Sequence, residues 1–223
     1  MSAYDVLLKH GVTRLCHFTK LQSLSYILES PNGIMATSRI ERDMLNQVDE
    51  VRADGELDYV CCSIEYPNSW YLDNAKKRNN DEIFRDWAII CINPEIVKIR
   101  EVKVCECNAA KNYGMYIREG EEEYIEHLFA NKVNSFRHPR TDRMIDACPT
   151  NSQTEILIKD GIPREYINSI IVGNDETARL VYAMRKTLGV DSIQIFISPN
   201  VVTTTWRQMI QDGIRPQECE YMG

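Results

Sequence analysis

The alternation of apolar and polar residues along the chain predicts many short strands separated by a few amphipathic helices. Residues 57–64 have the period of two that a half-buried strand requires, with Tyr59, Cys61 and Ser63 on one face. Residues 87–92 are almost entirely apolar, which is typical of a strand covered on both faces. Further strands are expected at residues 15–19, 34–37, 99–105, 113–117, 155–158, 167–172 and 192–197.

Four segments between these strands have helical spacing. A capping box from Thr19 to Gln22 is expected to begin a helix that ends near Ser30, before a Pro-Asn-Gly turn. The other helices are expected from near Pro67 to Arg78, and at residues 121–132 and 177–188. Because strands and helices follow no regular βαβ order, the pattern favours an α+β fold.

The length and composition fit one globular domain over residues 1–223. Hydrophobic residues make up 43% of the chain, enough for a substantial core, and no repeat or low-complexity linker divides it. No apolar stretch approaches the roughly 18 residues that span a bilayer, and the first residues lack the layout of a signal peptide. We therefore expect a cytoplasmic protein with no membrane segment.

The eight cysteines lie mostly in apolar, strand-like stretches. This placement fits free thiols in a reducing compartment better than a disulfide framework. Cys105 and Cys107 are too closely spaced for a zinc knuckle, and no second cysteine or histidine pair accompanies them. No metal site is expected.

The charge distribution is uneven. A net charge of −7 argues against a protein that coats nucleic acid indiscriminately. However, an acidic stretch at residues 119–126 is followed by a basic one, which contains Arg137, His138, Arg140 and Arg143. Such groups can hold a nucleic acid strand if they line one groove, although an ordinary solvated surface explains them equally well.

Two pairs of polar residues suggest chemistry on a sugar. Gln153 and Glu155 are two apart at the head of a strand, so their side chains are expected on one face. Glu155 is placed to hold a sugar hydroxyl, and Gln153 to contact the group that attacks the sugar. His17 and Thr19, also two apart, are placed to hydrogen-bond a flat polar group such as a carboxamide. A surface Gln-Glu pair and a core histidine are the alternative interpretations.

Arginines precede the strand at residues 57–64. Arg39, Arg42 and Arg52 lie in a polar segment expected to pass over the same cleft, and an arginine fork suits a diphosphate. The spacing does not choose among them. Arg52 is our first choice.

Three segments of the chain, in the same order, resemble the DarT family of DNA ADP-ribosyltransferase toxins. Residues 15–19 (LCHFT) are similar to the family's opening YHIT strand, and residues 58–60 match its DYV strand. Residues 153–157 (QTEIL), followed by Ile162-Pro163, are similar to its QAEFL strand and subsequent proline. Residues 61–71 look more like the branch of the family that modifies guanine than the branch that modifies thymine.

The resemblance implies a fold, a reaction and partners. The fold is an ADP-ribosyltransferase-like split β-sandwich with flanking helices. The reaction consumes NAD and transfers ADP-ribose to a base in single-stranded DNA, with guanine favoured and thymine possible. The protein would be a toxin, opposed by a DarG-like antitoxin with a macrodomain.

The resemblance also implies roles for residues. The residues expected to be catalytic are Glu155, Arg52 and Gln153. Those expected to bind the NAD are His17, Thr19, Arg42, Tyr59 and Ser63. The basic loop with Arg137, His138, Arg140 and Arg143 is expected to receive the DNA.

Other functions stay open on the sequence alone. A protein or RNA ADP-ribosyltransferase, or a tRNA 2′-phosphotransferase, would share much of the pattern, and a non-catalytic nucleic-acid-binding module would need only the basic loop. A cysteine hydrolase based on Cys16 is disfavoured, because Cys16 and His17 point to opposite faces of a strand.

Overall fold

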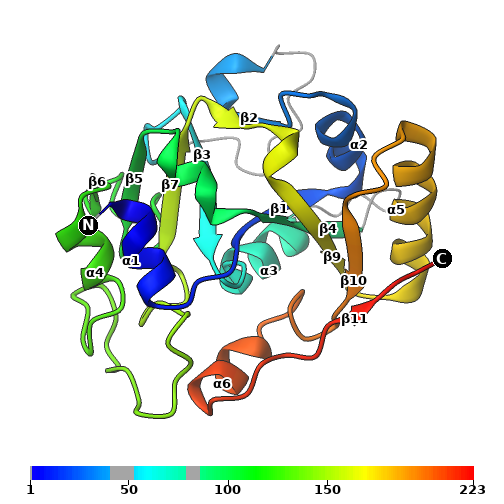
Figure 1. Cartoon of the computed structure of the whole chain (residues 1–223). Coiled ribbons are helices and arrows are strands. Elements are labelled where there is room, and N and C mark those ends of the chain that lie inside the picture. Colours follow the sequence, from blue (N-terminus) through cyan, green and yellow to red (C-terminus); the bar gives the residue numbers. More distant parts are fainter. Residues whose placement is uncertain (1, 41–52, 79–85) are drawn as a thin grey trace.

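The structure, a computed structural model, describes residues 2–40, 53–78 and 86–223. Within these residues the chain forms a nine-stranded mixed sheet flanked by helices, with the two termini on opposite sides of the view (Figure 1). The strand order is β11-β10-β9-β4-β1-β3-β7-β5-β6. Strands β9 and β10 are parallel, and the other neighbours are antiparallel.

The strands of the large sheet have the following bounds: β1 Leu15–Lys20, β3 Tyr59–Ile64, β4 Trp87–Ile92, β5 Val102–Cys105, β6 Ile117–Glu119, β7 Glu155–Lys159, β9 Ile167–Val172, β10 Gln194–Ile197 and β11 Cys219–Glu220. A separate two-stranded sheet pairs β2 (Ile34–Met35) with β8 (Gly161–Ile162).

Helices cover both faces of the sheet. The bounds are α1 Ala3–Lys9, α2 Leu21–Glu29, α3 Ser69–Arg78, α4 Glu122–His127, α5 Asp175–Leu188 and α6 Trp206–Gln211, with short 3-10 turns at Thr37–Arg39, Pro94–Lys98 and Arg164–Tyr166. Helices α1, α2, α4 and α5 pack on the face that carries the largest apolar core, whereas α3 and α6 pack on the other face. The helices of the described residues include none that is long and apolar enough to cross a membrane.

The pairing between β1 and β3 is short. Only Leu15 and Cys16 of β1 have partners on β3, whereas all six residues of β1 pair with β4. Strand β1 therefore leaves β3 after Cys16 and follows β4. This divergence opens a gap in the sheet, and the gap is the structural basis of the cavity described below.

The strand pattern predicted from sequence is largely confirmed, and three local predictions are wrong. Helix α2 is capped by Lys20 without a side-chain bond, because Thr19 lies inside β1, paired with Ala88 and buried. A strand was expected at residues 113–117, but residues 109–116 form turns and β6 begins only at Ile117. The helix expected over residues 121–132 is shorter and ends at His127.

Candidate active site

A cavity of about 280 Å³ occupies the gap between β1 and β3. Its walls include four of the residues predicted to bind NAD (His17, Thr19, Tyr59 and Ser63) together with Glu155. Because alternate residues of a strand point to opposite faces, His17 and Thr19 come from the face covered by α2, whereas Ser63 and Glu155 come from the opposite face. The cavity thus brings together groups that an intact sheet would separate.

Glu155 is the most completely held group in the cavity. Its side chain is only 6% exposed. Oε1 accepts hydrogen bonds from Nδ2 of Asn108 at 3.0 Å and from Nδ2 of Asn68 at 3.4 Å, and Oε2 accepts one from the backbone amide of Ala109 at 2.8 Å. Three donors from two different loops therefore fix the orientation of this carboxylate.

Burial raises the pKa of Glu155 from its ordinary value to about 7. The hydrogen bonds from Ala109, Asn68 and Asn108 act in the opposite direction, because they stabilise the charged form, and the nearby charge of Asp54 raises the pKa further. A carboxyl group with a pKa of about 7 is half ionised at neutral pH. It is suited to stabilising a developing positive charge or to taking a proton.

Asn68 links Glu155 to the start of helix α3. Its backbone amide donates to Oγ of Ser63 at 2.8 Å, and its Oδ1 accepts from the backbone amide of Tyr71 at 3.1 Å, which is the hydrogen bond of a helix N-cap. Asn68 is 1% exposed. The cap of α3, Ser63 on β3 and Glu155 on β7 therefore form one buried polar network.

His17 bridges the gap between the strands. Its Nδ1 lies 3.0 Å from the carbonyl oxygen of Cys61. A carbonyl oxygen can only accept, so Nδ1 carries the proton in this bond. Thr19 lines the same cavity one residue beyond Phe18, whose ring packs against Tyr71 and Trp87.

Tyr59 lines the cavity with its hydroxyl already engaged. The hydroxyl donates to Oε1 of Glu101 at 2.5 Å, and Nζ of Lys103 lies 4.7 Å from the ring centroid. Burial raises the pKa of this phenol above its usual value, with the Glu101 bond as the second cause. Tyr59 therefore offers a ring surface to a ligand in the cavity.

The structure places Gln153 differently from the sequence prediction. Gln153 lies in a turn before β7, and its backbone amide donates to Oδ1 of Asn151 at 3.0 Å. The side chain of Asn151 thus competes with strand pairing and delays β7 until Glu155. The expectation that Gln153 and Glu155 share a strand face is wrong, and Gln153 is not among the described residues that line the cavity.

Arg140 has a structural role in the basic loop. Arg140 donates from Nη1 to the carbonyl oxygen of Cys148 at 2.6 Å and from Nη2 to that of Ile145 at 2.7 Å, and its side chain is 13% exposed. Its guanidinium holds the loop together, and a contact between Arg140 and DNA phosphates stays a prediction from the sequence. Arg137, His138 and Arg143 are exposed, as a DNA-contacting role requires.

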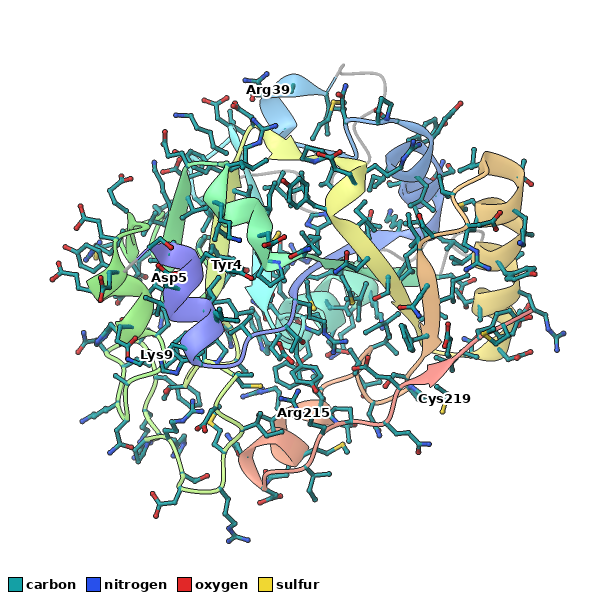
Figure 2. All side chains as sticks on the ribbon, in the orientation of Figure 1. Tyr4, Asp5, Lys9, Arg39, Arg215 and Cys219 are labelled. Carbon is teal, nitrogen blue, oxygen red and sulfur yellow. The ribbon has the colours of Figure 1, made fainter. Side chains whose placement is uncertain are left out.

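Of the three arginines considered for the diphosphate, only Arg39 lies among the described residues. Arg42 and Arg52 lie outside the described residues. Arg39 lies at the periphery of the molecule, paired with Asp160 at 2.5 Å, and its side chain is 57% exposed (Figure 2). The cavity walls formed by the described residues include neither arginine nor lysine.

Several residues that line the cavity or bond to Glu155 were not predicted from the sequence. Asn68, a donor to Glu155, had a usable signal, because an asparagine directly before a helix is a preferred N-cap. Asn108 and Asp54, which line the cavity, and Ala109, which donates to Glu155, had none, because they lie in loops whose course depends on tertiary packing. Tyr26 of α2 lines the cavity and is 57% exposed.

A cysteine hydrolase based on Cys16 loses support. Burial raises the pKa of the Cys16 thiol well above its ordinary value, so this cysteine is protonated and a poor nucleophile. Across residues 2–40, 53–78 and 86–223, His, Cys, Asp and Glu side chains form no group of three or more that could hold a metal ion.

Several solved structures of DarT proteins have a fold similar to that of this chain. DarT from Thermus sp. 2.9 in complex with ADP-ribosylated ssDNA has a TM-score of 0.62 and 13% sequence identity, covering 85% of this chain and 96% of that chain. The same protein in complex with carba-NAD+ has a TM-score of 0.59 and 14% identity, covering 84% and 96%. Comparison with curated proteins gives no match.

A longer protein shares the same fold. Thermosipho africanus DarTG in complex with ADP-ribose has a TM-score of 0.61 and 16% identity, covering 85% of this chain. The match covers 51% of that protein, so this chain spans about half of its length. These likenesses show that the chain has the DarT fold, a large mixed sheet with flanking helices. The family model described as "ssDNA thymidine ADP-ribosyltransferase, DarT" matches residues 16–203, and the chain therefore belongs to the DarT family of ADP-ribosyltransferases.

Proposed function

We propose that this protein transfers ADP-ribose from NAD to a base in single-stranded DNA. The observation that carries the proposal is the cavity between β1 and β3, where Glu155 lies opposite the His17 and Thr19 pair. Membership of the DarT family supports the reaction, as do similar folds solved with NAD+, carba-NAD+ and ADP-ribosylated ssDNA.

The chemistry places the greatest demand on Glu155. The bond between the ribose C1′ and the nicotinamide nitrogen breaks, and its electron pair leaves with nicotinamide. The ribose then carries oxocarbenium-like positive charge until a base nitrogen or oxygen bonds to C1′ and loses a proton. An ionised Glu155, bonded to the ribose 2′-hydroxyl, stabilises this charge in a site with little water.

The remaining residues position the reactants. His17 and Thr19 hold the nicotinamide end, and Ser63 and the Tyr59 ring line the wall beside the ribose. Arg52 is proposed as the catalytic arginine and Arg42 as a ligand of the diphosphate, because a guanidinium fork matches phosphate oxygens.

The acceptor strand is proposed to approach along the loop at residues 131–152. Arg137, His138 and Arg143 are exposed there and available to phosphates. Gln153 follows in the turn before β7, outside the cavity, and is proposed to contact the acceptor base. Residues 61–71 favour guanine as that base, whereas the family description names thymidine.

One experiment separates the acceptor classes. Purified protein is incubated with NAD and short oligonucleotides of DNA or RNA that differ in one base, or with a protein mixture, and the products are weighed by mass spectrometry. The mass of one ADP-ribose on single-stranded DNA, with guanine preferred, is the expected result. Modification of RNA or protein in place of DNA would assign the other acceptor class, and tight DNA binding without NAD turnover would make the chain a binding module.

We further propose that the protein is a toxin whose partner is an antitoxin with a macrodomain. The likeness to T. africanus DarTG supports this proposal. Induction of the chain in bacteria should arrest growth, and a co-expressed macrodomain that removes ADP-ribose from DNA should restore it. Growth arrest that persists in a Glu155→Gln variant would argue against a catalytic toxin. The cytoplasmic location and the single domain stay predictions from the sequence.

A further inference from the structure

A tight turn beside the cavity joins β5 to β6. Successive backbone hydrogen bonds from residue i+3 to residue i close it, with the donors Lys111, Tyr113, Met115 and Ile117 and lengths of 3.0 to 3.3 Å. Overlapping bonds of this kind leave the backbone few alternative conformations. We call residues 110–115 the prong.

The prong adjoins both the cavity and the basic loop. Its base is the segment that holds the carboxylate, because Asn108 and Ala109 donate to Glu155 and Ala110 lines the cavity. On the other side, Nζ of Lys111 donates to the carbonyl oxygen of Ser135, at the start of the basic loop, at 3.4 Å. A strand that binds along both the basic loop and the cavity therefore has the prong beside it.

The backbone of the prong is strained at an unexpected residue. Asn112, Tyr113 and Gly114 have φ angles of 51°, 56° and 80°. Glycine is required at position 114, because a Cβ atom there would lie 2.8 Å from the carbonyl oxygen of Asp54. At position 112 the backbone is less costly, because asparagine tolerates the left-handed region. A bulky tyrosine in this region is unusual and unfavourable.

Packing does not offset the strain at Tyr113. Its side chain is 87% exposed, and that of Met115 beside it is 65% exposed. A tyrosine that strains the backbone and leaves its ring in water adds little to the stability of the fold. Residues held in this way are concentrated at sites of function.

We propose that Tyr113 stacks on a base of the acceptor strand next to the base that is modified. This inference rests on the proposed function and adds a binding residue to it. Aromatic rings stack on any base, so such a contact holds the strand without choosing its sequence. Lys111 on the same prong is exposed and placed to meet a neighbouring phosphate. The acidic residues from Glu119 onward disfavour a path in that direction, so the strand lies toward the basic loop.

The first test compares substitutions at Tyr113 in the full chain. Tyr113→Ala should raise the KM for a single-stranded oligonucleotide about tenfold, in the range that one base-aromatic stack supplies, and Tyr113→Phe should restore it. NAD binding, measured by calorimetry, should be unchanged. Tyr113→Asn should show the same KM defect with an equal or higher melting temperature, because asparagine fits the left-handed backbone. Leu180→Ala, at an exposed position on α5, is the control and should change none of these.

The second test locates the stacked base. For the wild type, an abasic site next to the acceptor base should raise the KM for the oligonucleotide. For Tyr113→Ala, the same abasic site should cause no further rise in KM. Equal abasic effects in both proteins, or a wild-type KM in Tyr113→Ala, would overturn the proposal while leaving DNA modification intact. A wild-type protein that modifies no DNA would refute the proposed function itself. If Tyr113→Ala modifies DNA normally but is no longer inhibited by the antitoxin, Tyr113 belongs to a protein interface and the proposal is overturned.

Discussion

Removing the Asn108 amide should shift the pH dependence of the reaction without abolishing it. In the wild type, a Glu155 pKa of about 7 leaves the carboxylate about one-tenth ionised at pH 6 and about nine-tenths ionised at pH 8. If the ionised form is the active one, kcat/KM rises about tenfold over this range. The Asn108 bond stabilises that ionised form at 3.0 Å.

The size of the shift follows from the strength of this bond. A hydrogen bond to a charged group contributes about 1.5–3 kcal/mol, and one pKa unit corresponds to about 1.4 kcal/mol. Asn108→Ala should therefore raise the apparent pKa by about one unit. At pH 7 the ionised fraction falls from about one-half to about one-tenth, a roughly fivefold loss of kcat/KM, and the loss vanishes at pH 9.

The assay is kcat/KM for oligonucleotide labelling, measured from pH 5.5 to 9. Gln194→Ala serves as the control, because Gln194 is an exposed amide on β10, four strands away from β3 in the sheet. A wild-type profile that is flat between pH 6 and 8 would refute an active Glu155 carboxylate. A loss in Asn108→Ala that is equal at every pH would show that Asn108 supports only the local structure.

Three further results are expected elsewhere in the molecule. Arg140→Ala should lower the free energy of unfolding by about 2 kcal/mol, since two loop carbonyls lose their donor. Arg137→Ala should leave the melting temperature unchanged and reduce the slope of DNA affinity against salt concentration by about one. Equal effects of the two variants would contradict these roles. Glu218→Ala should lower the free energy of unfolding by about 3 kcal/mol and the melting temperature by roughly 6–12 °C. It leaves the largely buried guanidinium of Arg14 without the carboxylate that accepts its hydrogen bonds at 2.6 and 2.7 Å. A fall in melting temperature of less than about 2 °C would count against this role of the ion pair. Tyr26→Ala should raise the KM for NAD about fivefold with kcat unchanged, because an exposed ring on the cavity wall suits stacking on a nucleotide. An unchanged KM for NAD would exclude that contact.

The sequence predicted the strands of the site better than its loops. The period of two in residues 57–64 correctly placed Tyr59, Cys61 and Ser63 on one face, and the apolar run at 87–92 correctly predicted a strand buried on both faces. Glu155 was correctly expected at the head of its strand. These features are local, so a few neighbouring residues determine them.

Features that depend on distant contacts could not be predicted. Periodicity gives the face of each residue but not the point where two strands separate, so it did not show that β1 leaves β3 after Cys16. The donors to Glu155 lie 46 to 87 residues away along the chain. Gln153 was misplaced because one Asn151 side chain favours a turn over the extended backbone that spacing alone suggests.

The proposed reaction depends on the Glu155 carboxylate, which stabilises the ribosyl cation as nicotinamide leaves. The most direct measurement compares wild type and Glu155→Gln in transfer of ADP-ribose from NAD to a single-stranded oligonucleotide, with NAD affinity and thermal melting recorded on the same samples. Because the raised pKa means that the folded wild type holds this proton more tightly than the unfolded chain, its stability should fall relative to the variant as pH rises from about 4.5 through 7. Transfer should fall by a factor on the order of 10² or more in Glu155→Gln, with NAD still bound and the fold intact. Transfer at the wild-type rate in that variant would contradict this role of Glu155.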